Sequence, residues 1–257
     1  MGNCIKSIKQ SFLGKMLKYV YYWAVDIQLR KKDYIVSIKN SKFYLPYIKT
    51  DEIQKTIYQR KDYMEGYNLN NICKIWKSGA IEDKMKDSAV LDIGANIGNH
   101  TLYFLNECNA NFVYCFEPAD DTFQILKRNI CINHLEERTC LMNVGVGSTS
   151  GEARIKSRRE KDTGYTKLET SKGGGITIVA IDELQINHKI GFVKIDVEGF
   201  ELDVIKGMVN ILKRDKPFIM IEVWDNNLNE ISRILSEIGY KSDVLDRREM
   251  NTDYLFY

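Results

Sequence analysis

The stretch AVLDIGANIG, residues 89–98, decides the fold that we expect for this chain. Its apolar residues, interrupted only by Asp92, predict a short buried parallel strand, and HTLYFLNEC at 100–108 predicts a helix. The glycine turn between them brings backbone N–H groups and a helix N-terminus to face an anion. A dinucleotide fingerprint requires glycines spaced G-x-G-x-x-G, whereas Asn96 and Asn99 occupy the second and third of those positions. The turn therefore argues against NAD or FAD.

Composition is typical of a globular protein in a reducing compartment. The 257 residues suffice for one large or two small domains, with 44% hydrophobic and 28% charged residues. No stretch reaches the roughly 18 apolar residues of a membrane span, and no signal peptide pattern is evident. Six cysteines show neither CxxC spacing nor paired histidines, which predicts reduced thiols and no bound metal. We therefore expect a cytoplasmic protein.

The N-terminal segment is a separate electrostatic unit. Residues 1–32 contain seven basic residues and one acidic residue, and apolar side chains recur at spacings of three and four over 4–30. This pattern predicts a basic amphipathic helix, which either packs on the following domain or makes weak contact with an anionic membrane surface. A hairpin at 33–47 and short helices at 51–60 and 68–78 follow. We assign residues 1–86 to this helix and a hairpin/helical cap, and residues 87–257 to the main domain.

From Ala89 onward, apolar runs alternate with amphipathic segments, which predicts a doubly wound α/β domain. The polar, mostly basic stretch 148–175 is expected to be a solvated loop; the alternative is that its charges steer an acidic acceptor. The run 176–184 is also prone to form a strand. The strands expected after the first lie at 112–118, 139–147, 192–201 and 218–224, followed by a closing antiparallel pair at 240–246 and 253–257.

Acidic and polar residues follow several of these strands. In an open parallel sheet, ligands bind across the carboxyl ends of the strands where strand order reverses. Asp92 and Gly94 end the first strand, Glu117 the second and Asp196 the fourth. An ionised carboxylate such as that of Glu117 accepts hydrogen bonds only and can bind both hydroxyls of an adenosine ribose. Asn143, at the end of the third strand, would then border the adenine.

A family resemblance rests on four segments taken together. DIGANIGNHT (92–101), FEP (116–118), NVGVG (143–147) and VKIDVEGFELDVIKG (193–207) resemble the FkbM-type S-adenosylmethionine-dependent methyltransferase family over roughly residues 60–225. The resemblance implies a class I methyltransferase Rossmann-like fold: a seven-stranded, mostly parallel sheet with an antiparallel C-terminal hairpin. It also implies S-adenosylmethionine as cofactor and O-methylation of a hydroxyl on a sugar, glycan or small metabolite. The positions that it assigns to cofactor binding are Asp92, Gly94, Asn96, Gly98, Glu117, Asn143 and Asp196.

Methyl transfer to a hydroxyl needs a base, because a hydroxyl is a weak nucleophile at neutral pH. Asp196 and Glu198, at the mouth of the fourth strand, are the catalytic candidates, with His100 and Glu222 behind them. For Glu198 the alternative is that it caps the next helix. For His100 the alternative is that its side chain is packed in the core or faces solvent and has no catalytic role.

Two other classes of function stay open. One nucleic-acid enzyme is disfavoured. A methyltransferase acting on nucleobase amines would carry an Asp/Asn-Pro-Pro-aromatic motif, and this chain has Asp196-Val-Glu-Gly at that position. A ribose 2′-O RNA methyltransferase would have a lysine beside the aspartate of the fourth strand. Lys194 lies on the same face of the predicted strand as Asp196, so this alternative stays open. A non-catalytic cofactor-binding or membrane-associated scaffold would use residues 1–32. Nucleic acid is the less favoured partner, and a small-molecule or glycan acceptor the more favoured one.

Overall fold

The computed structural model describes residues 34–158 and 166–257. The predicted amphipathic helix at 4–30 lies outside these residues. The chain divides into two units, Met1–Ile35 and Val36–Tyr257, and the second contains the sheets, the helices and the cavities described below. The predicted boundary at residue 86 stays a prediction, although residues 36–86 belong to the same unit as the main domain.

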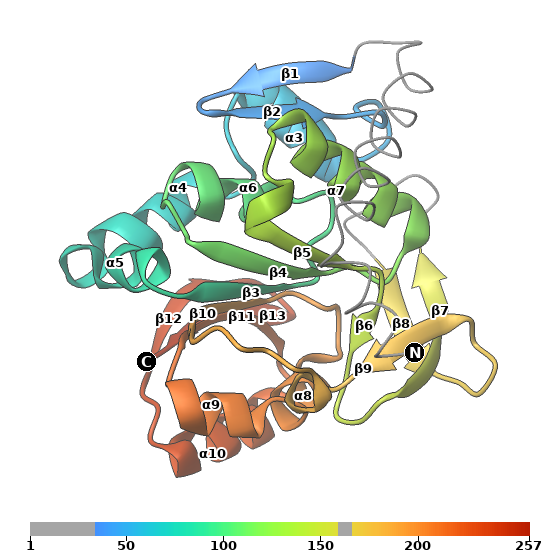
Figure 1. Ribbon diagram of the computed structural model, residues 1–257. Coiled ribbons are helices and arrows are strands. Elements are labelled where there is room, and N and C mark those ends of the chain that lie inside the picture. Colours follow the sequence, from blue (N-terminus) through green and yellow to red (C-terminus); the bar gives the residue numbers. More distant parts are fainter. Residues whose placement is uncertain (1–33, 159–165) are drawn as a thin grey trace. The chain divides into compact units, whose positions relative to one another are not determined.

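A seven-stranded sheet forms the centre of this unit, with strand order β12-β13-β11-β10-β3-β4-β5 (Figure 1). Strand order reverses beside β3, because β4 and β5 extend from one of its edges and β10 and β11 from the other. Neighbouring strands from β11 to β5 run parallel, and β13 is antiparallel to β11 and β12. The predicted sheet and its closing hairpin are thus present. The strands are β3 (Ala89–Ile93), β4 (Phe112–Phe116), β5 (Thr139–Met142), β10 (Ile190–Ile195), β11 (Phe218–Trp224), β12 (Ser242–Arg247) and β13 (Asn251–Phe256).

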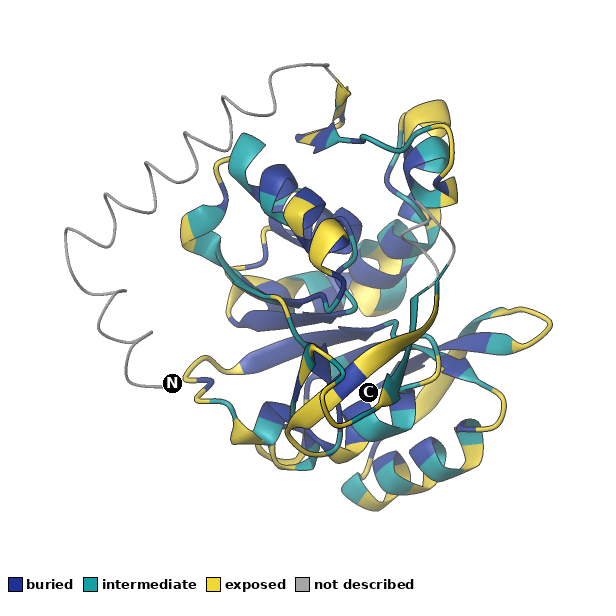
Figure 2. Cartoon of the chain, turned by 90° about the vertical axis from the view of Figure 1, so that its right-hand side faces the viewer, coloured by how far each residue is buried: buried dark blue, intermediate teal, exposed yellow. Residues whose placement is uncertain are grey.

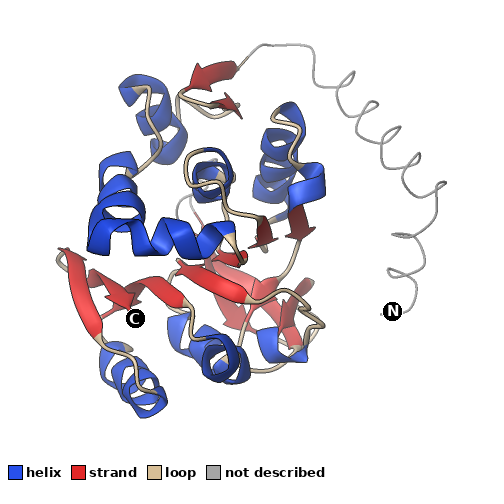
Figure 3. Ribbon diagram, turned by 60° about the vertical axis from the view of Figure 1, so that its left-hand side comes forward, coloured by secondary structure: helices blue, strands red, loops and turns tan. Residues whose placement is uncertain are grey.

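Helices cover both faces of the sheet (Figure 3). This explains why every residue of β3 and β10 is buried and why both strands are nearly continuous apolar runs. One face is covered by α5 (Ala80–Lys86), α6 (Asn99–Asn106) and α7 (Asp120–Ile132). The other is covered by α8 (Glu201–Lys206), α9 (Val209–Asp215) and α10 (Leu228–Ile238). Short 3-10 helices lie at Glu136–Arg138 and Ile181–Glu183.

The segment before the sheet confirms the predicted hairpin and the first short helix. β1 (Ile35–Ile38) and β2 (Ser41–Tyr44) form the hairpin, and α3 spans Glu52–Arg60. Asp51 caps α3, since its side chain accepts the N–H of Gln54 at 2.7 Å. The second predicted helix is interrupted. It begins as α4 (Gly66–Asn70), continues as a π-helix (Asn71–Ile75) and tightens into a 3-10 turn (Trp76–Gly79).

The predicted third strand and the predicted loop after it are both wrong in part. The strand expected over 139–147 ends at Met142, and the chain then leaves the central sheet for a second sheet of order β6-β9-β7-β8. Two strands of that sheet lie within 148–175, where a solvated loop was expected. Most residues of β7 are exposed (Figure 2), so this strand carries no alternating apolar signal. The strands are β6 (Gly145–Val146), β7 (Gly151–Arg158), β8 (Thr166–Thr170) and β9 (Ile176–Val179).

Among the described residues, no helix has the length and apolar character needed to cross a bilayer.

Candidate active site

The glycine turn between β3 and α6 is fixed by the two neighbouring strand ends. The N–H groups of Gly94 and Ala95 both donate to the carbonyl oxygen of Phe116 at 3.0 Å. Gly94 has φ +79°, and a Cβ at this position would lie 1.9 Å from the carbonyl oxygen of Asp196. Asn96 also has positive φ, +51°, a conformation that asparagine tolerates better than most residues. The turn therefore accepts no side chain at Gly94 and presents residues 94–96 toward the β4 and β10 ends.

Glu117 follows β4 and closes the other side of this turn. Its carboxylate accepts the N–H of Asn96 at 3.0 Å and the N–H of Ala119 at 2.8 Å. The side chain is almost wholly buried, at 6% exposure. Burial raises the pKa of Glu117 to about 7, against the opposing effect of the two N–H donors and the charge of Arg158. The carboxyl group is thus pre-oriented and poorly solvated, which suits it to accept hydroxyl donors from a ligand.

A cavity of about 400 Å³ opens at this end of the sheet, beside the point where strand order reverses. Five of the predicted site residues line it. They are Gly94, Asn96, Glu117, Asp196 and Glu198. The two further candidates, His100 and Glu222, line it as well. Its size is that of a pocket for a cofactor-sized ligand.

The other three predicted residues support the cavity from outside its lining. Asp92 is fully buried and accepts a hydrogen bond from the Thr101 hydroxyl at 2.5 Å. Gly98, at φ +88°, directly precedes α6. The side-chain amide of Asn143 donates to the carbonyl oxygens of Glu117 and Pro118 at 2.9 and 3.2 Å. Their direct contact with a cofactor stays a prediction.

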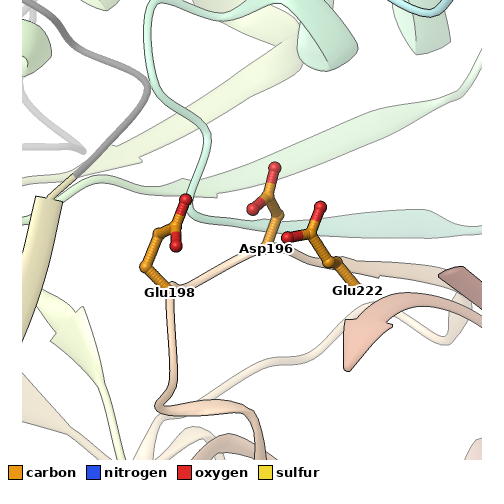
Figure 4. A group of neighbouring side chains, drawn as sticks. All are labelled: Asp196, Glu198 and Glu222. Atoms are coloured by element: carbon orange, nitrogen blue, oxygen red, sulfur yellow. The ribbon is translucent and has the colours of Figure 1, made fainter. Parts of the chain in front are cut away.

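Three carboxylates converge beyond the glycine turn, on the side of the cavity that β10 and β11 form. Asp196, Glu198 and Glu222 each offer an oxygen, all within 4.8 Å of one another, and their carboxyl groups point to the same side (Figure 4). Burial and the charge of Asp196 raise the pKa of Glu198 to about 7, and they also raise the pKa of Glu222. Carboxylate oxygens at such spacing are ligands that hard divalent cations accept. The absence of a metal stays a prediction.

Two cations already compensate these carboxylates. The ammonium of Lys194 lies 2.9 Å from Asp196 Oδ2. Burial acts against this charge, but the charges of Asp196 and Asp92 raise the pKa of Lys194 above its usual range. Arg248, from the turn between β12 and β13, binds Glu222 at 2.7 Å and Glu65 at 2.9 Å. The acidic cluster is therefore neutralised in part by the protein itself.

The helix-cap alternative for Glu198 is wrong. The residue at the N-cap of α8 is Phe200, which makes no side-chain cap hydrogen bond. The N–H of Gly199 donates instead to the carboxylate of Glu201 at 2.5 Å. Glu198 itself has φ +50°, an unfavourable conformation that places its side chain at the cavity.

Sequence analysis missed Glu65 and Arg248, which complete the cavity wall. His100 Nε2 lies 3.5 Å from Glu65 Oε2, and the His100 ring stacks near Phe104 with centroids 6.2 Å apart. Arg248 joins Glu65 to the β11 end as described above. Both residues lie in polar segments outside the predicted strand ends, so no local pattern marks them.

Comparisons with known proteins identify methyltransferases as relatives of this chain. A family model described as "Methyltransferase FkbM domain" matches residues 92–242. The hexuronic acid methyltransferase AglP of Haloferax volcanii is 29% identical over 168 residues, which is 64% of this chain and 68% of that protein. Methyltransferase sdnD of Sordaria araneosa is 23% identical over 202 residues, or 64% and 77% of the two chains.

A solved structure supports the fold. Methyltransferase FkbM from Methylobacillus flagellatus KT superposes with a TM-score of 0.51 at 22% identity, over 67% of this chain and 44% of that one. At this identity the likeness concerns the fold alone, and it confirms the predicted class I methyltransferase architecture.

Proposed function

This chain belongs to the FkbM methyltransferase family, and from that premise we propose that it transfers a methyl group from S-adenosylmethionine to a hydroxyl of a sugar, glycan or small metabolite. The single observation that carries the choice of cofactor is Glu117, a buried carboxylate held by two backbone N–H groups beside the glycine turn. The name of the relative AglP, a hexuronic acid methyltransferase, supports a sugar as the acceptor.

The residues around the glycine turn fit this cofactor. Glu117 would accept the two ribose hydroxyls, whose donation favours its ionised form. Residues 94–96 would contact the rest of the molecule through backbone that no side chain obstructs, since Gly94 has no Cβ. When bound, S-adenosylmethionine supplies an electrophilic methyl group on a positively charged sulfur. Asp196 and Glu198 lie on the same cavity and would stabilise that charge.

Glu198 is the carboxylate best suited to take the proton from the acceptor hydroxyl. Asp196 is engaged by Lys194 at 2.9 Å, and Glu222 by Arg248 at 2.7 Å. Glu198 is half-buried, and its pKa of about 7 matches a base that works near neutral pH. The remaining residues then hold the acceptor in place and exclude water.

Calorimetric titration with S-adenosylhomocysteine tests the cofactor. We expect the wild-type protein to bind it, NADH to give no heat of binding, and Glu117→Ala to weaken binding about 10- to 100-fold, because a charge-assisted contact contributes about 1.5–3 kcal/mol. Glu137→Ala, which removes an exposed carboxylate that is not among the residues lining the cavity, is the matched control. Thermal unfolding of both variants separates lost binding from lost folding. A wild-type protein that folds and does not bind the ligand would refute the proposal.

A further inference from the structure

A second cavity adjoins the one described above. It measures about 210 Å³ and shares three lining residues with the main cavity: Leu168, Glu198 and Phe200. Its remaining wall comes from β7, β8 and the end of β11. That wall includes Lys156, Lys167, Trp224 and Asn226.

Resting on the proposed function, we propose that this side cavity is a second acceptor subsite and that it binds a phosphate group carried by the acceptor. When the reactive hydroxyl of an acceptor lies at Glu198, the rest of the acceptor extends away from this residue. Because Leu168, Glu198 and Phe200 line both cavities, such a molecule can extend along these residues toward the side cavity. An acceptor longer than one sugar ring would therefore occupy both cavities.

The charges of the two cavities differ in sign. The main cavity gathers Asp196, Glu198 and Glu222 on one side. Lys194 and Arg248 compensate these carboxylates only in part, so the cluster would repel an anion placed among them. Among the described residues that line the side cavity, two are lysines and one, Glu198 at the shared wall, is acidic. The pKa of Glu198, about 7, leaves this carboxyl partly protonated near neutral pH. An acceptor with an anionic end is thus oriented with its hydroxyls toward the carboxylates and its anion toward the lysines.

The cations of the side cavity favour phosphate over carboxylate. Lys167 Nζ lies 3.7 Å from the centroid of the Trp224 ring, which holds this ammonium at the cavity. Lys156 is exposed on β7 and lines the same space. Lysine binds either anion as a point charge, so the preference rests on charge: a phosphate monoester carries close to two negative charges near neutral pH, and a carboxylate carries one. Both cations among the described lining residues are lysines, and two of them balance a phosphate dianion.

The indole N–H of Trp224 offers a direct readout. The chain has three tryptophans, so protein labelled with ¹⁵N-tryptophan gives a small set of indole signals that Trp→Phe variants assign. Glucose 1-phosphate, glucose and glucuronate are the three probes, titrated in 0.15 M NaCl. Lys156→Gln and Lys167→Gln test the subsite. Lys213→Gln, an exposed lysine on α9, removes the same charge elsewhere.

We expect glucose 1-phosphate to shift the Trp224 signal in a saturable way and glucose to leave it unchanged. Each subsite variant should raise the Kd for glucose 1-phosphate about tenfold, because it loses one charge-assisted contact. Lys213→Gln should bind this probe as the wild type does. No saturable shift, or equal weakening by Lys213→Gln, would overturn the proposal. A glucuronate shift as strong as that of glucose 1-phosphate would overturn the choice of phosphate. S-adenosylhomocysteine calorimetry on the same samples separates failure of the subsite proposal from failure of the proposed function, because only the second predicts that the cofactor product does not bind.

Discussion

The pKa of Glu117 makes cofactor binding depend on pH in a direction that the structure fixes. Burial raises this pKa to about 7. Ribose hydroxyls need the ionised carboxylate as their acceptor, so S-adenosylhomocysteine should bind more tightly as pH rises. One unit below the pKa only about a tenth of the carboxyl groups are ionised, and one unit above about nine tenths are. Affinity should therefore rise about tenfold between pH 6 and pH 8, or about 1.4 kcal/mol.

Calorimetry in buffers of different ionisation enthalpy measures both the affinity and the protons released. We expect the release of nearly one proton per ligand at pH 6 and almost none at pH 8. Because Glu198 also has a pKa of about 7, Glu117→Ala serves as the control, and its remaining affinity should vary little with pH. Constant wild-type affinity over this range, or a tenfold dependence that survives in Glu117→Ala, would refute the assignment of the ribose contact to Glu117.

Folding stability should depend on pH in the opposite sense. The folded-state pKa of Glu117 lies above the ordinary glutamate value of 4.5, so its contribution to stability is fully present below the unfolded-state pKa. That contribution is lost as pH rises through about 7. Glu198 and Asp253, with pKa values also raised by burial to about 7, act in the same direction. Ligand binding recovers part of this loss, so the thermal shift on adding S-adenosylhomocysteine should be larger at pH 8 than at pH 6.

Three substitutions test other parts of the site. Gly94→Ala should lower the melting temperature and abolish S-adenosylhomocysteine binding, because its Cβ would lie 1.9 Å from the Asp196 carbonyl oxygen at φ +79°; unchanged melting and binding would contradict this. Glu198→Gln should retain ligand binding in calorimetry while methyl transfer slows about 10²- to 10⁴-fold, and undiminished transfer would remove Glu198 as the base. Lys194→Met leaves Asp196 and the buried Asp92 without their shared counter-charge, which should cost about 3–5 kcal/mol in urea unfolding; a loss no larger than that of Lys213→Met, at an exposed lysine on α9, would argue against this cause.

Sequence reasoning succeeded where local pattern and topology coincide. Every residue of β3 (Ala89–Ile93) and β10 (Ile190–Ile195) is buried, so the apolar character of these two runs alone identified them as central strands. Parallel strands bring their carboxyl ends to one edge of the sheet. For that reason Glu117 and Asp196 could be placed at one site although 79 residues separate them in the chain.

The same reasoning failed for the second sheet. β7 and β8 pair with each other along most of their length, and of the residues in β7 only Ala153 is buried. Such a strand is stabilised by backbone hydrogen bonds and cross-strand contacts such as Arg154 with Glu169 at 2.7 Å. Neither leaves an apolar pattern in the sequence. The sequence of 148–175 therefore predicted a solvated loop. The side cavity, which is lined in part by β7 and β8, could not be predicted from it.

Arg248 shows why the acceptor side of the site was harder to predict than the cofactor side. Its guanidinium contacts Glu65, Glu222 and Asp253 at 2.9, 2.7 and 2.9 Å. These three partners lie far from one another in the sequence. Taken singly, each carboxylate has no sequence feature that distinguishes it from an ordinary polar residue. A cation among three carboxylates is informative only after the fold brings them together. Cofactor contacts follow from the ends of adjacent strands, whereas this wall follows from how the closing hairpin meets the segment before α4. The contacts that we propose for the acceptor therefore belong to the part of the site that only the tertiary structure reveals.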